Sequence, residues 1–347
     1  MGTIEIVAKY NLKYKNWNFN PDIMEYGRSF AFANYEKIIN NEQEKINYII
    51  IAQGSRVENH SKDFKYIKEK EIKIDNVISH YKRNNGNYVI KLFFMDADAP
   101  IIEDAKLFAH YIDNLASQTS TNSINVIGLS KCSVMNFYIP SFFQNIKSFE
   151  KTNIYNIAAP YTGTKLASPL IFYPEVKKMI NSKIGDNIIS DRIYKELITF
   201  YEKISSNSHM DYDIAISNGI PPSKYSIYDE KFIKNVFCAN NIEAIKQLRT
   251  FKNFITGIDA NTLNESIFTM NITGIGLCIL DDLFFDNKSD VMVYTDCQRE
   301  VEKFLDIKSK VLKSTHHDVN SNTRAFNEVL WVVDDTIEEN KKLAKKI

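Results

Sequence analysis

A serine stands where a buried-strand pattern changes into a helical pattern. "INVIGLS" (124–130) is typical of a buried strand, and "KCSVMNFYIPSFFQNI" from Lys131 onward is typical of a helix. A nucleophilic serine on such a tight turn is lifted out at the carboxyl edge of a sheet, and the turn requires small residues two positions on either side. Gly128 meets this requirement, and Cys132 is small although larger than glycine. Ser130 is therefore a candidate nucleophile, but the motif alone also fits an ordinary serine N-cap.

A serine nucleophile needs a base, and three histidines follow Ser130 at some distance in the chain. His209 lies in a helical stretch, where we expect it at the surface. His316 and His317 directly follow the strand-like run 307–315 and precede the last helical pattern. A loop in that place would present an imidazole at the carboxyl edge of the sheet. "THHD" also fits a polar loop with a helix cap, so both interpretations stay open at this point.

The acid of a triad has three candidates in the stretch "FFDNKSDVMVYTDCQ". They are Asp286, Asp290 and Asp296. Asp290 is best placed, at the head of "DVMVYTDCQ". An isolated aspartate in a loop is usually a turn residue, so its position in the order nucleophile, acid, base is what favours it.

Backbone N–H groups could stabilise a developing oxyanion at two places. Lys131 follows Ser130 at the start of the predicted helix, where free N–H donors and the helix dipole favour negative charge. The strand "INYIIIAQG" (46–54) ends in Gln53 and Gly54 and is followed by Ser55. The glycine lets the backbone approach a substrate closely, so we expect the second donor from Gln53, Gly54 or Ser55.

These residues need a scaffold, which the hydrophobic pattern supplies. Apolar β-branched runs alternate with helical patterns, which indicates a mostly parallel sheet covered by helices on both faces. The segment before Ile46 fits one or two strands and a helix, the latter in "DIMEYGRSFAFANYEKIIN". From about 165 to 265 the pattern is helical and amphipathic with no comparable strand, which predicts a helical insertion. The runs are expected as strands at 46–54, 87–97, 124–130, 152–160, 266–280 and 307–315, and as helices at 101–118 and 323–347.

Composition narrows the class of function. Lys plus Arg and Asp plus Glu both number 43, so the formal net charge is zero, which argues against nucleic acid as the main partner. The four cysteines form no CxxC pair, so we expect no zinc cluster and no disulfide framework. No run is long and apolar enough for an export signal or a membrane span, so a cytoplasmic protein is expected.

Five stretches, taken in order, resemble the α/β-hydrolase superfamily and its lipase and esterase branch. They are "IIIAQGS", "VIGLSKCS", "YNIAAPYTGT", "SDVMVYTDCQ" and "STHHDV". The likeness spans Ile46 to Val319 and leaves the helical insertion unmatched. Three positions depart from the family pattern: Gln53 and Tyr161 stand where histidines are usual, and Cys132 where the second glycine of the serine motif is usual.

The resemblance implies an α/β-hydrolase fold with a core at 1–164 and 266–347 and a helical lid at 165–265. It implies a serine hydrolase for a carboxylic ester, with a lipid or another acyl ester as substrate and with no metal or organic cofactor. Ser130 would attack, His316 would act as the base and Asp290 would orient it. His316 is preferred to His317 because two polar residues and an apolar one follow it. Lys131 and the Gln53–Ser55 loop would form the oxyanion hole.

Alternatives stay open beside this hypothesis. A peptidase, thioesterase or acyltransferase would use the same triad with a different pocket. A catalytically silent binding module of the same fold would keep the elements and lose the chemistry. Transient contact with a membrane surface is compatible with the sequence, and nothing in it indicates an oligomeric state.

Overall fold

The structure is a computed structural model of the chain, and it describes residues 31–54, 76–95, 101–162, 177–178, 180–182, 185–195, 234–257, 295–314, 319 and 323–344. Its centre is a seven-stranded sheet in the order β1-β3-β2-β4-β5-β6-β7. The strands are β1 (Ala31–Ile38), β2 (Ile46–Gly54), β3 (Asn87–Met95), β4 (Thr121–Leu129), β5 (Thr152–Ile157), β6 (Thr250–Gly257) and β7 (Lys310–Lys313). β1 runs antiparallel to β3, and every other neighbouring pair is parallel. The α/β class and the mostly parallel sheet predicted from the sequence are confirmed.

Both faces of the sheet are buried, which explains the nearly continuous apolar runs of its strands. Along β2, Tyr48, Ile50 and Ala52 belong to one hydrophobic core, whereas Ile49 and Ile51 belong to the other. Because successive side chains of a strand point to opposite faces, each strand contributes to both cores.

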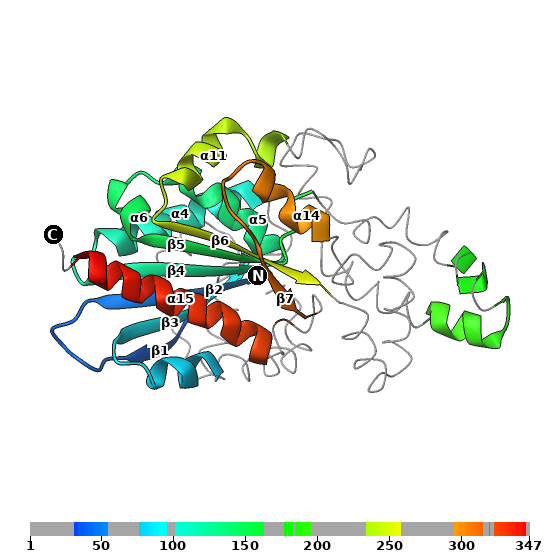
Figure 1. Cartoon of the computed structure of the whole chain (residues 1–347), viewed down its shortest axis with the longest axis horizontal. Coiled ribbons are helices and arrows are strands. Elements are labelled where there is room, and N and C mark those ends of the chain that lie inside the picture. Colours follow the sequence, from blue (N-terminus) through cyan, green and yellow to red (C-terminus); the bar gives the residue numbers. More distant parts are fainter. Residues whose placement is uncertain are drawn as a thin grey trace, which may run out of the picture.

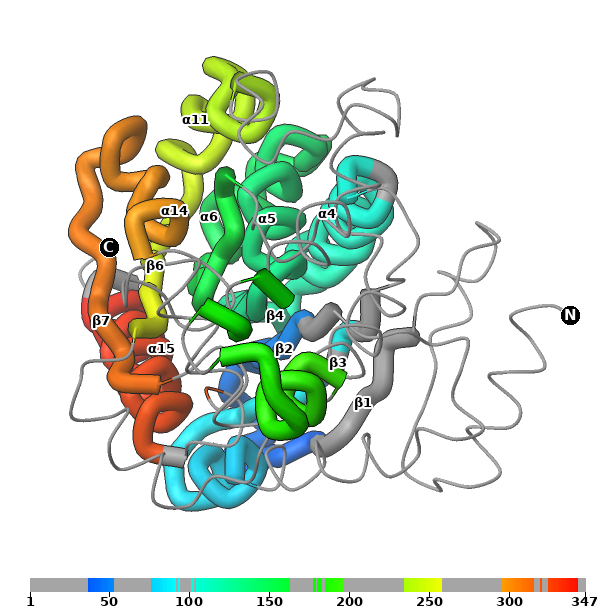
Figure 2. The backbone as a smooth tube through the Cα atoms, turned by 90° about the vertical axis from the view of Figure 1, so that its right-hand side faces the viewer, coloured from blue at the N-terminus to red at the C-terminus, as the bar shows by residue number. Residues whose placement is uncertain are grey.

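Helices form a layer on each face (Figures 1 and 2). One layer contains α4 (Ile101–Ser117), α5 (Lys131–Tyr138), α6 (Ile146–Lys151) and α11 (Ala239–Lys246). The long α15 (Thr323–Ala344) covers the other face together with the helical residues 76–82. The helices predicted at 101–118 and 323–347 and the helix after Ser130 are confirmed.

The strand β6 corrects the predicted domain boundary. It lies inside the range 165–265 assigned to a helical insertion, yet it is a strand of the central sheet, between β5 and the edge strand β7. Phe251 and Phe254 have a helix-like spacing, and the polar Asn253 between them hides the strand pattern. Asn253 is buried because side chains from distant segments hydrogen-bond to it. The sheet therefore resumes at 250, and the predicted strand 266–280 lies outside the described residues.

The amino-terminal side of the sheet gives a second correction. The stretch 22–40 was predicted to contain a helix, but its last part is β1, which pairs with β3 through seven residue pairs from Ala31 with Phe94 to Ile38 with Tyr88. The alanines and the glutamate of "AFANYEKI" favour a helix in isolation. Backbone hydrogen bonds to a preformed strand override that local preference.

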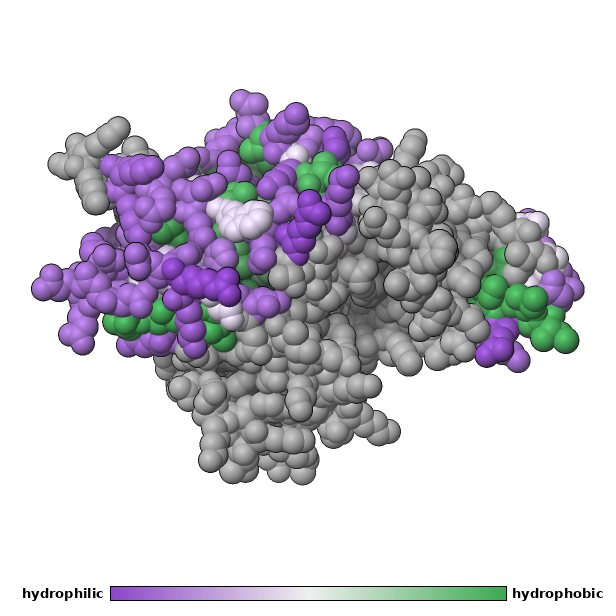
Figure 3. All heavy atoms as spheres, turned by 60° about the horizontal axis from the view of Figure 1, so that its bottom comes forward, coloured by the Kyte–Doolittle hydropathy of each residue, from purple (hydrophilic) through white to green (hydrophobic). Residues whose placement is uncertain are grey.

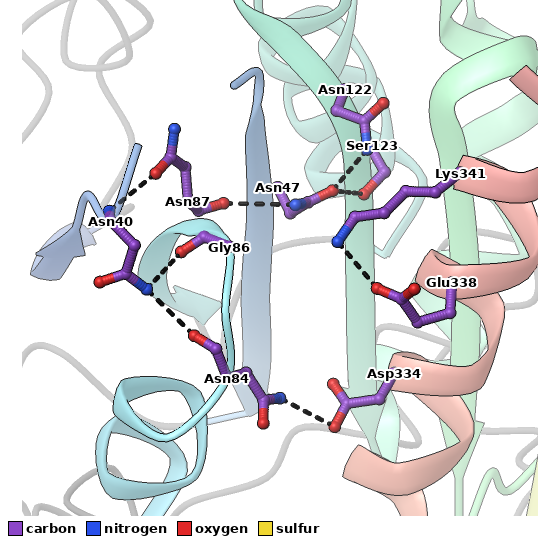
Figure 4. A network of polar contacts seen from close by, with 10 residues as sticks. All are labelled: Asn40, Asn47, Asn84, Gly86, Asn87, Asn122, Ser123, Asp334, Glu338 and Lys341. Atoms are coloured by element: carbon purple, nitrogen blue, oxygen red, sulfur yellow. Dashed lines mark hydrogen bonds and ion pairs between the residues drawn. The ribbon is translucent and has the colours of Figure 1, made fainter. Parts of the chain in front are cut away.

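Side-chain amides close the amino ends of the strands, at the edge opposite Ser130 (Figure 4). The Oδ1 atom of Asn47 accepts hydrogen bonds from Asn122 and Ser123, both at 2.8 Å. The Oδ1 atom of Asn87 accepts from the backbone N–H of Asn40 at 2.9 Å. Asn84 extends this set to α15 through Asp334 at 3.1 Å. Buried amides therefore satisfy backbone groups where the strands begin.

The surface over the described core is largely hydrophilic in the face drawn in Figure 3. An exception lies in the segment 185–195, where Ile188 and Ile189 are 87% and 67% exposed. None of the helices described is both long and apolar enough to cross a membrane.

Candidate active site

Ser130 lies in a strained backbone conformation between β4 and α5. Its φ and ψ angles are 54° and −122°. Positive φ is uncommon for a residue with a Cβ atom, and such outliers cost of order 1–3 kcal/mol and gather at functional sites. This strain is what a nucleophile on a strand-to-helix turn requires.

The alternative of an ordinary helix cap does not fit this geometry. Ser130 occupies the N-cap position of α5, but its side chain makes no capping hydrogen bond to the helix. An N-cap serine normally has extended backbone angles and uses its hydroxyl to accept from the first turn. Ser130 therefore occupies the cap position, but neither its backbone conformation nor the role of its hydroxyl is that of a capping serine.

Packing beneath the turn depends on Gly128. A Cβ atom at this position would lie 2.3 Å from the Nδ2 atom of Asn136 and 3.0 Å from the carbonyl oxygen of Cys132. Cys132 is completely buried in the α5 side of the core. The first small residue of the motif is thus needed for close approach of α5, while the cysteine at the second position is accommodated.

Hydrogen bonds tie this turn to the end of the neighbouring strand β5. The N–H of Ser130 donates to the carbonyl of Ile157 at 3.0 Å. The hydroxyl of Ser133 contacts the carbonyl oxygens of Gly128 and Ile157 at 2.7 and 2.9 Å and accepts from the N–H of Ile157 at 3.0 Å. The next residue, Ala158, also has a φ of 54°. Two strained residues therefore end two adjacent strands at the same edge.

A buried polar cluster lies behind the turn. Asn156 faces Gly128 in the register of β4 with β5, and Asn253 faces Asn156 in that of β5 with β6. The amide of Asn156 donates to the carbonyl of Ser133 at 2.8 Å and to the hydroxyl of Tyr161 at 2.9 Å. That hydroxyl in turn donates to the Oδ1 atom of Asn253 at 3.2 Å.

Tyr161, which replaces a histidine of the family pattern, belongs to this cluster. It is completely buried. Burial raises the pKa of its hydroxyl well above the ordinary value, and the hydrogen bond from Asn156 offsets this only in part. The phenol therefore stays protonated and keeps its donor for Asn253 over the whole range of pH in which proteins fold.

The predicted oxyanion residues are described in part. Gln53 pairs with Leu129 in the register of β2 with β4, so the end of β2 lies beside the residue that precedes Ser130. Gly54 is the last residue of β2, and Lys131 is the first of α5 and is buried. The structure thus brings the backbone of Gln53 and Gly54 to the same edge as Ser130, while Ser55 lies outside the described residues.

The predicted acid and bases, Asp290, His316 and His317, lie outside the described residues. The described chain resumes at α14 (Thr295–Arg299) after Asp290, and it stops at Ser314 before His316. Ser314 forms a bridge with Gly257 at the carboxyl end of β6.

Sequence reasoning missed the polar residues that support the turn: Ser133, Asn136, Asn156 and Asn253. A signal for them was present, because an asparagine inside an apolar strand must find partners when it is buried. "NIYNIAAP" contains two and "TFKNFITG" contains one. Over the described residues, no group of three His, Cys, Asp or Glu side chains is placed to hold a metal ion.

Comparison with known proteins gives likeness in structure alone. No protein-family model matches the sequence, and no curated protein matches it. A lipase from Bacillus licheniformis is similar at a TM-score of 0.43 and 10% identity, over 87% of this chain and 97% of that one. A carboxylesterase structure from Nitrososphaera gargenis gives 0.44 and 9%, over 93% and 99% of the two chains. An N-acyl homoserine lactonase bound to N-butanoyl homoserine gives 0.41 and 12%, over 89% and 93%.

The fold itself follows from the features described above. The sheet is parallel except for one edge strand and carries helices on both faces. A strained serine joins the middle strand β4 to the helix that follows it. This strand–serine–helix turn resembles the nucleophile elbow of the α/β-hydrolase fold.

Proposed function

We propose that the chain is a serine hydrolase that cleaves a carboxylic ester through an acyl-enzyme. Ser130 attacks the carbonyl carbon, and His316 takes its proton and later gives it to the leaving alcohol. Asp290 holds the imidazole in the correct tautomer. Water then attacks the acyl-enzyme with the same histidine as base, which releases the acid and restores the serine.

The observation that carries this proposal is the backbone of Ser130. Its φ of 54° and ψ of −122° store strain that an ordinary helix start would not need. Lys131 is the first residue of α5, and we propose that its N–H faces the developing oxyanion. Together with the end of β2, this N–H would stabilise the oxyanion, and such a donor is worth about 3 kcal/mol in the transition state.

Labelling with a fluorophosphonate probe tests the nucleophile. We expect the folded wild type to be labelled at Ser130 and the Ser130→Ala variant to remain unlabelled. Hydrolysis of p-nitrophenyl esters should fall at least about a thousandfold in that variant, because the other groups of the site leave only residual catalysis. Ser117→Ala, at an exposed serine near the end of α4 whose hydroxyl donates to the carbonyl of Asn114, is the matched control and should keep full activity.

The base is tested by the two adjacent histidines. His316→Ala should abolish ester turnover and His317→Ala should spare it, and the reverse result would assign the base to His317. Absence of labelling in the folded wild type would defeat the proposal and favour a binding module without catalysis.

The insertion is part of the same proposal. Because β6 begins at Thr250, the insertion is the part of the chain between β5 and β6. We propose that it forms a lid that shapes an apolar pocket for the acyl group. Turnover across a series of acyl-chain lengths separates a preference for lipids from one for short esters. Parallel series of thioesters and amides separate an esterase from a thioesterase or a peptidase, and added alcohol acceptors reveal an acyltransferase.

A further inference from the structure

The strain at Ser130 has to be held by its surroundings, because a free turn would relax it. The first turn of α5 is fixed by the carbonyl of Ser133, which accepts from the amide of Asn156 at 2.8 Å. The hydroxyl of Ser133 joins Gly128 and Ile157 on either side of the turn. Asn156 is therefore the side chain of β5 that, beside the backbone of Ile157, holds the start of the helix.

Asn156 is held in turn by Tyr161. Its amide donates to the Tyr161 hydroxyl at 2.9 Å, and the hydroxyl passes a hydrogen bond to Asn253 on β6 at 3.2 Å. The phenol is the link between the two asparagines on this path, and all three side chains are buried. Removing the hydroxyl would take a hydrogen-bond partner from the amide of Asn156 and from the Oδ1 atom of Asn253, and a buried polar group without a partner destabilises its surroundings.

The far end of this path is anchored at α14. The amide of Asn253 donates to the carbonyl of Gln298 and to the hydroxyl of Ser309, both at 2.8 Å. The side chain of Gln298 closes the contact by accepting from the N–H of Thr256 at 2.8 Å and donating to its carbonyl at 3.1 Å. Thr162, the residue after Tyr161, has a side-chain hydrogen bond with the thiol of Cys297 on α14. Burial raises the pKa of that thiol, and this hydrogen bond offsets the rise in part.

We propose that Tyr161 is a positioning residue for the reaction of Ser130. Its hydroxyl locks Asn156 to β6 and α14, and the locked Asn156 holds the first turn of α5 so that the strained serine keeps its attacking position. This inference rests on the proposed function, because it concerns the reactivity of Ser130. It goes beyond that function because Tyr161 itself touches neither substrate nor the reacting atoms.

The test compares two tyrosine-to-phenylalanine variants. In Tyr161→Phe the ring remains and only the hydroxyl is lost. We expect kcat and the rate of fluorophosphonate labelling to fall roughly tenfold with KM unchanged, because a small displacement of a reacting group costs rate rather than binding. Tyr81→Phe is the matched control, since Tyr81 is equally buried on the opposite face of the sheet and its hydroxyl has no hydrogen-bond partner among the residues that the structure describes. It should keep the wild-type rates.

Hydrogen exchange supplies a readout that does not depend on activity. Amide exchange measured by mass spectrometry should become faster in Tyr161→Phe at residues 128–138 and 295–303, and should stay unchanged there in Tyr81→Phe. Asn253→Ser, which shortens the partner on the other side of the hydroxyl, is the second variant and should show the same fall in kcat at constant KM. It keeps the test open if Tyr161→Phe does not fold.

The outcomes separate this inference from the proposed function. A wild type that does not react at Ser130 overturns both. A reactive wild type with unchanged kcat in the folded variants overturns the inference alone, as does a loss of kcat without a change of exchange at 128–138. A loss of folded protein that explains the whole loss of rate also overturns it, because the role would then be structural.

Discussion

Ser130 and Ala158 have the same positive φ of 54° at the ends of adjacent strands. The N–H of Ser130 donates to the residue before Ala158, and the N–H of Ala158 donates to the carbonyl of Phe254 on β6 at 3.0 Å. Each strained residue is thus held by the strand beside it. At the scale of single residues, the edge of the sheet that carries Ser130 is built from backbone conformations that the neighbouring strands enforce.

Gly128 is the residue on which this edge is least tolerant of change. We expect Gly128→Ala to lower the free energy of unfolding by about 1–3 kcal/mol, because the new methyl group would overlap the amide of Asn136. Chemical denaturation followed by circular dichroism measures it. Gly257→Ala is the control with the same change in composition, since its Cβ atom would meet the Cγ2 atom of Thr295 at 3.3 Å, a close contact that needs a much smaller shift. Equal losses in the two variants would contradict the overlap argument.

In the helix α15, the apolar and the polar residues have separate roles. Its buried stripe contains Phe326, Val329, Leu330, Val333 and Ile337, at the spacing of one helix face. Asp334 beside that stripe contacts His80 at 2.7 Å and accepts from Asn84 at 3.1 Å, which joins α15 to the segment 76–86. The apolar stripe supplies the burial of this face, and the polar contacts fix where the helix lies on it.

Two neighbouring residues of α15 test how much its buried apolar stripe contributes to stability. Leu330 is completely buried, whereas Trp331 is 54% exposed. Leu330→Ala should cost about 2–5 kcal/mol of unfolding free energy through lost burial and a cavity. Trp331→Ala should cost less than about 1 kcal/mol, because exposed positions contribute little. Thermal denaturation of both variants measures these losses. A larger loss of unfolding free energy for Trp331→Ala would contradict the prediction and mean that the opposite face of α15 is covered.

Elements with a plain apolar pattern could be predicted from the sequence, whereas those that depend on distant partners could not. β2, β3, β4, β5 and β7 and the helices α4 and α15 follow from periodicity. β6 was missed because Asn253 breaks its pattern, and its partners come from Tyr161, Gln298 and Ser309. In the site, the tight turn at Ser130 was predictable, since small residues and a strand–helix junction are local. The support from Asn156 and Tyr161 was not, because it forms only when β4, β5 and β6 lie side by side.

At the scale of the whole molecule, one buried charge opposes folding. Lys91 on β3 is 8% exposed. Its Nζ atom contacts the hydroxyl of Tyr111 and lies 5.0 Å from the centre of that ring and 5.7 Å from the ring of Tyr48. Burial lowers the pKa of Lys91 from 10.5 to about 8. The unfolded chain therefore binds a proton that the folded chain resists, so stability should rise as the pH rises from about 8 towards 10.5.

Lys91→Met isolates this contribution. Because methionine keeps most of the apolar volume and does not titrate, the variant lacks the pH dependence that comes from the lysine. Between pH 7 and pH 9.5 the wild type should gain roughly 2 kcal/mol of unfolding free energy relative to Lys91→Met. Urea denaturation at the two pH values measures the gain, and the comparison cancels the other titrating groups. Parallel pH dependence in both proteins would show that Lys91 keeps an ordinary pKa.

The neighbours β5 and β6 are far apart in the chain, as the 92 positions between Tyr161 and Asn253 illustrate. Pairings at such separation form slowly, and during synthesis they wait until the later segment has left the ribosome. The carbonyl of Phe254 and the amide of Asn253, which hold the end of β5, therefore arrive after the serine turn has been made. A nascent chain that ends before β6 contains Ser130 but lacks the strand that holds it in the strained conformation. The strained conformation of Ser130 is thus a late product of folding, and under the proposed function an ester would be attacked only once the sheet is nearly complete.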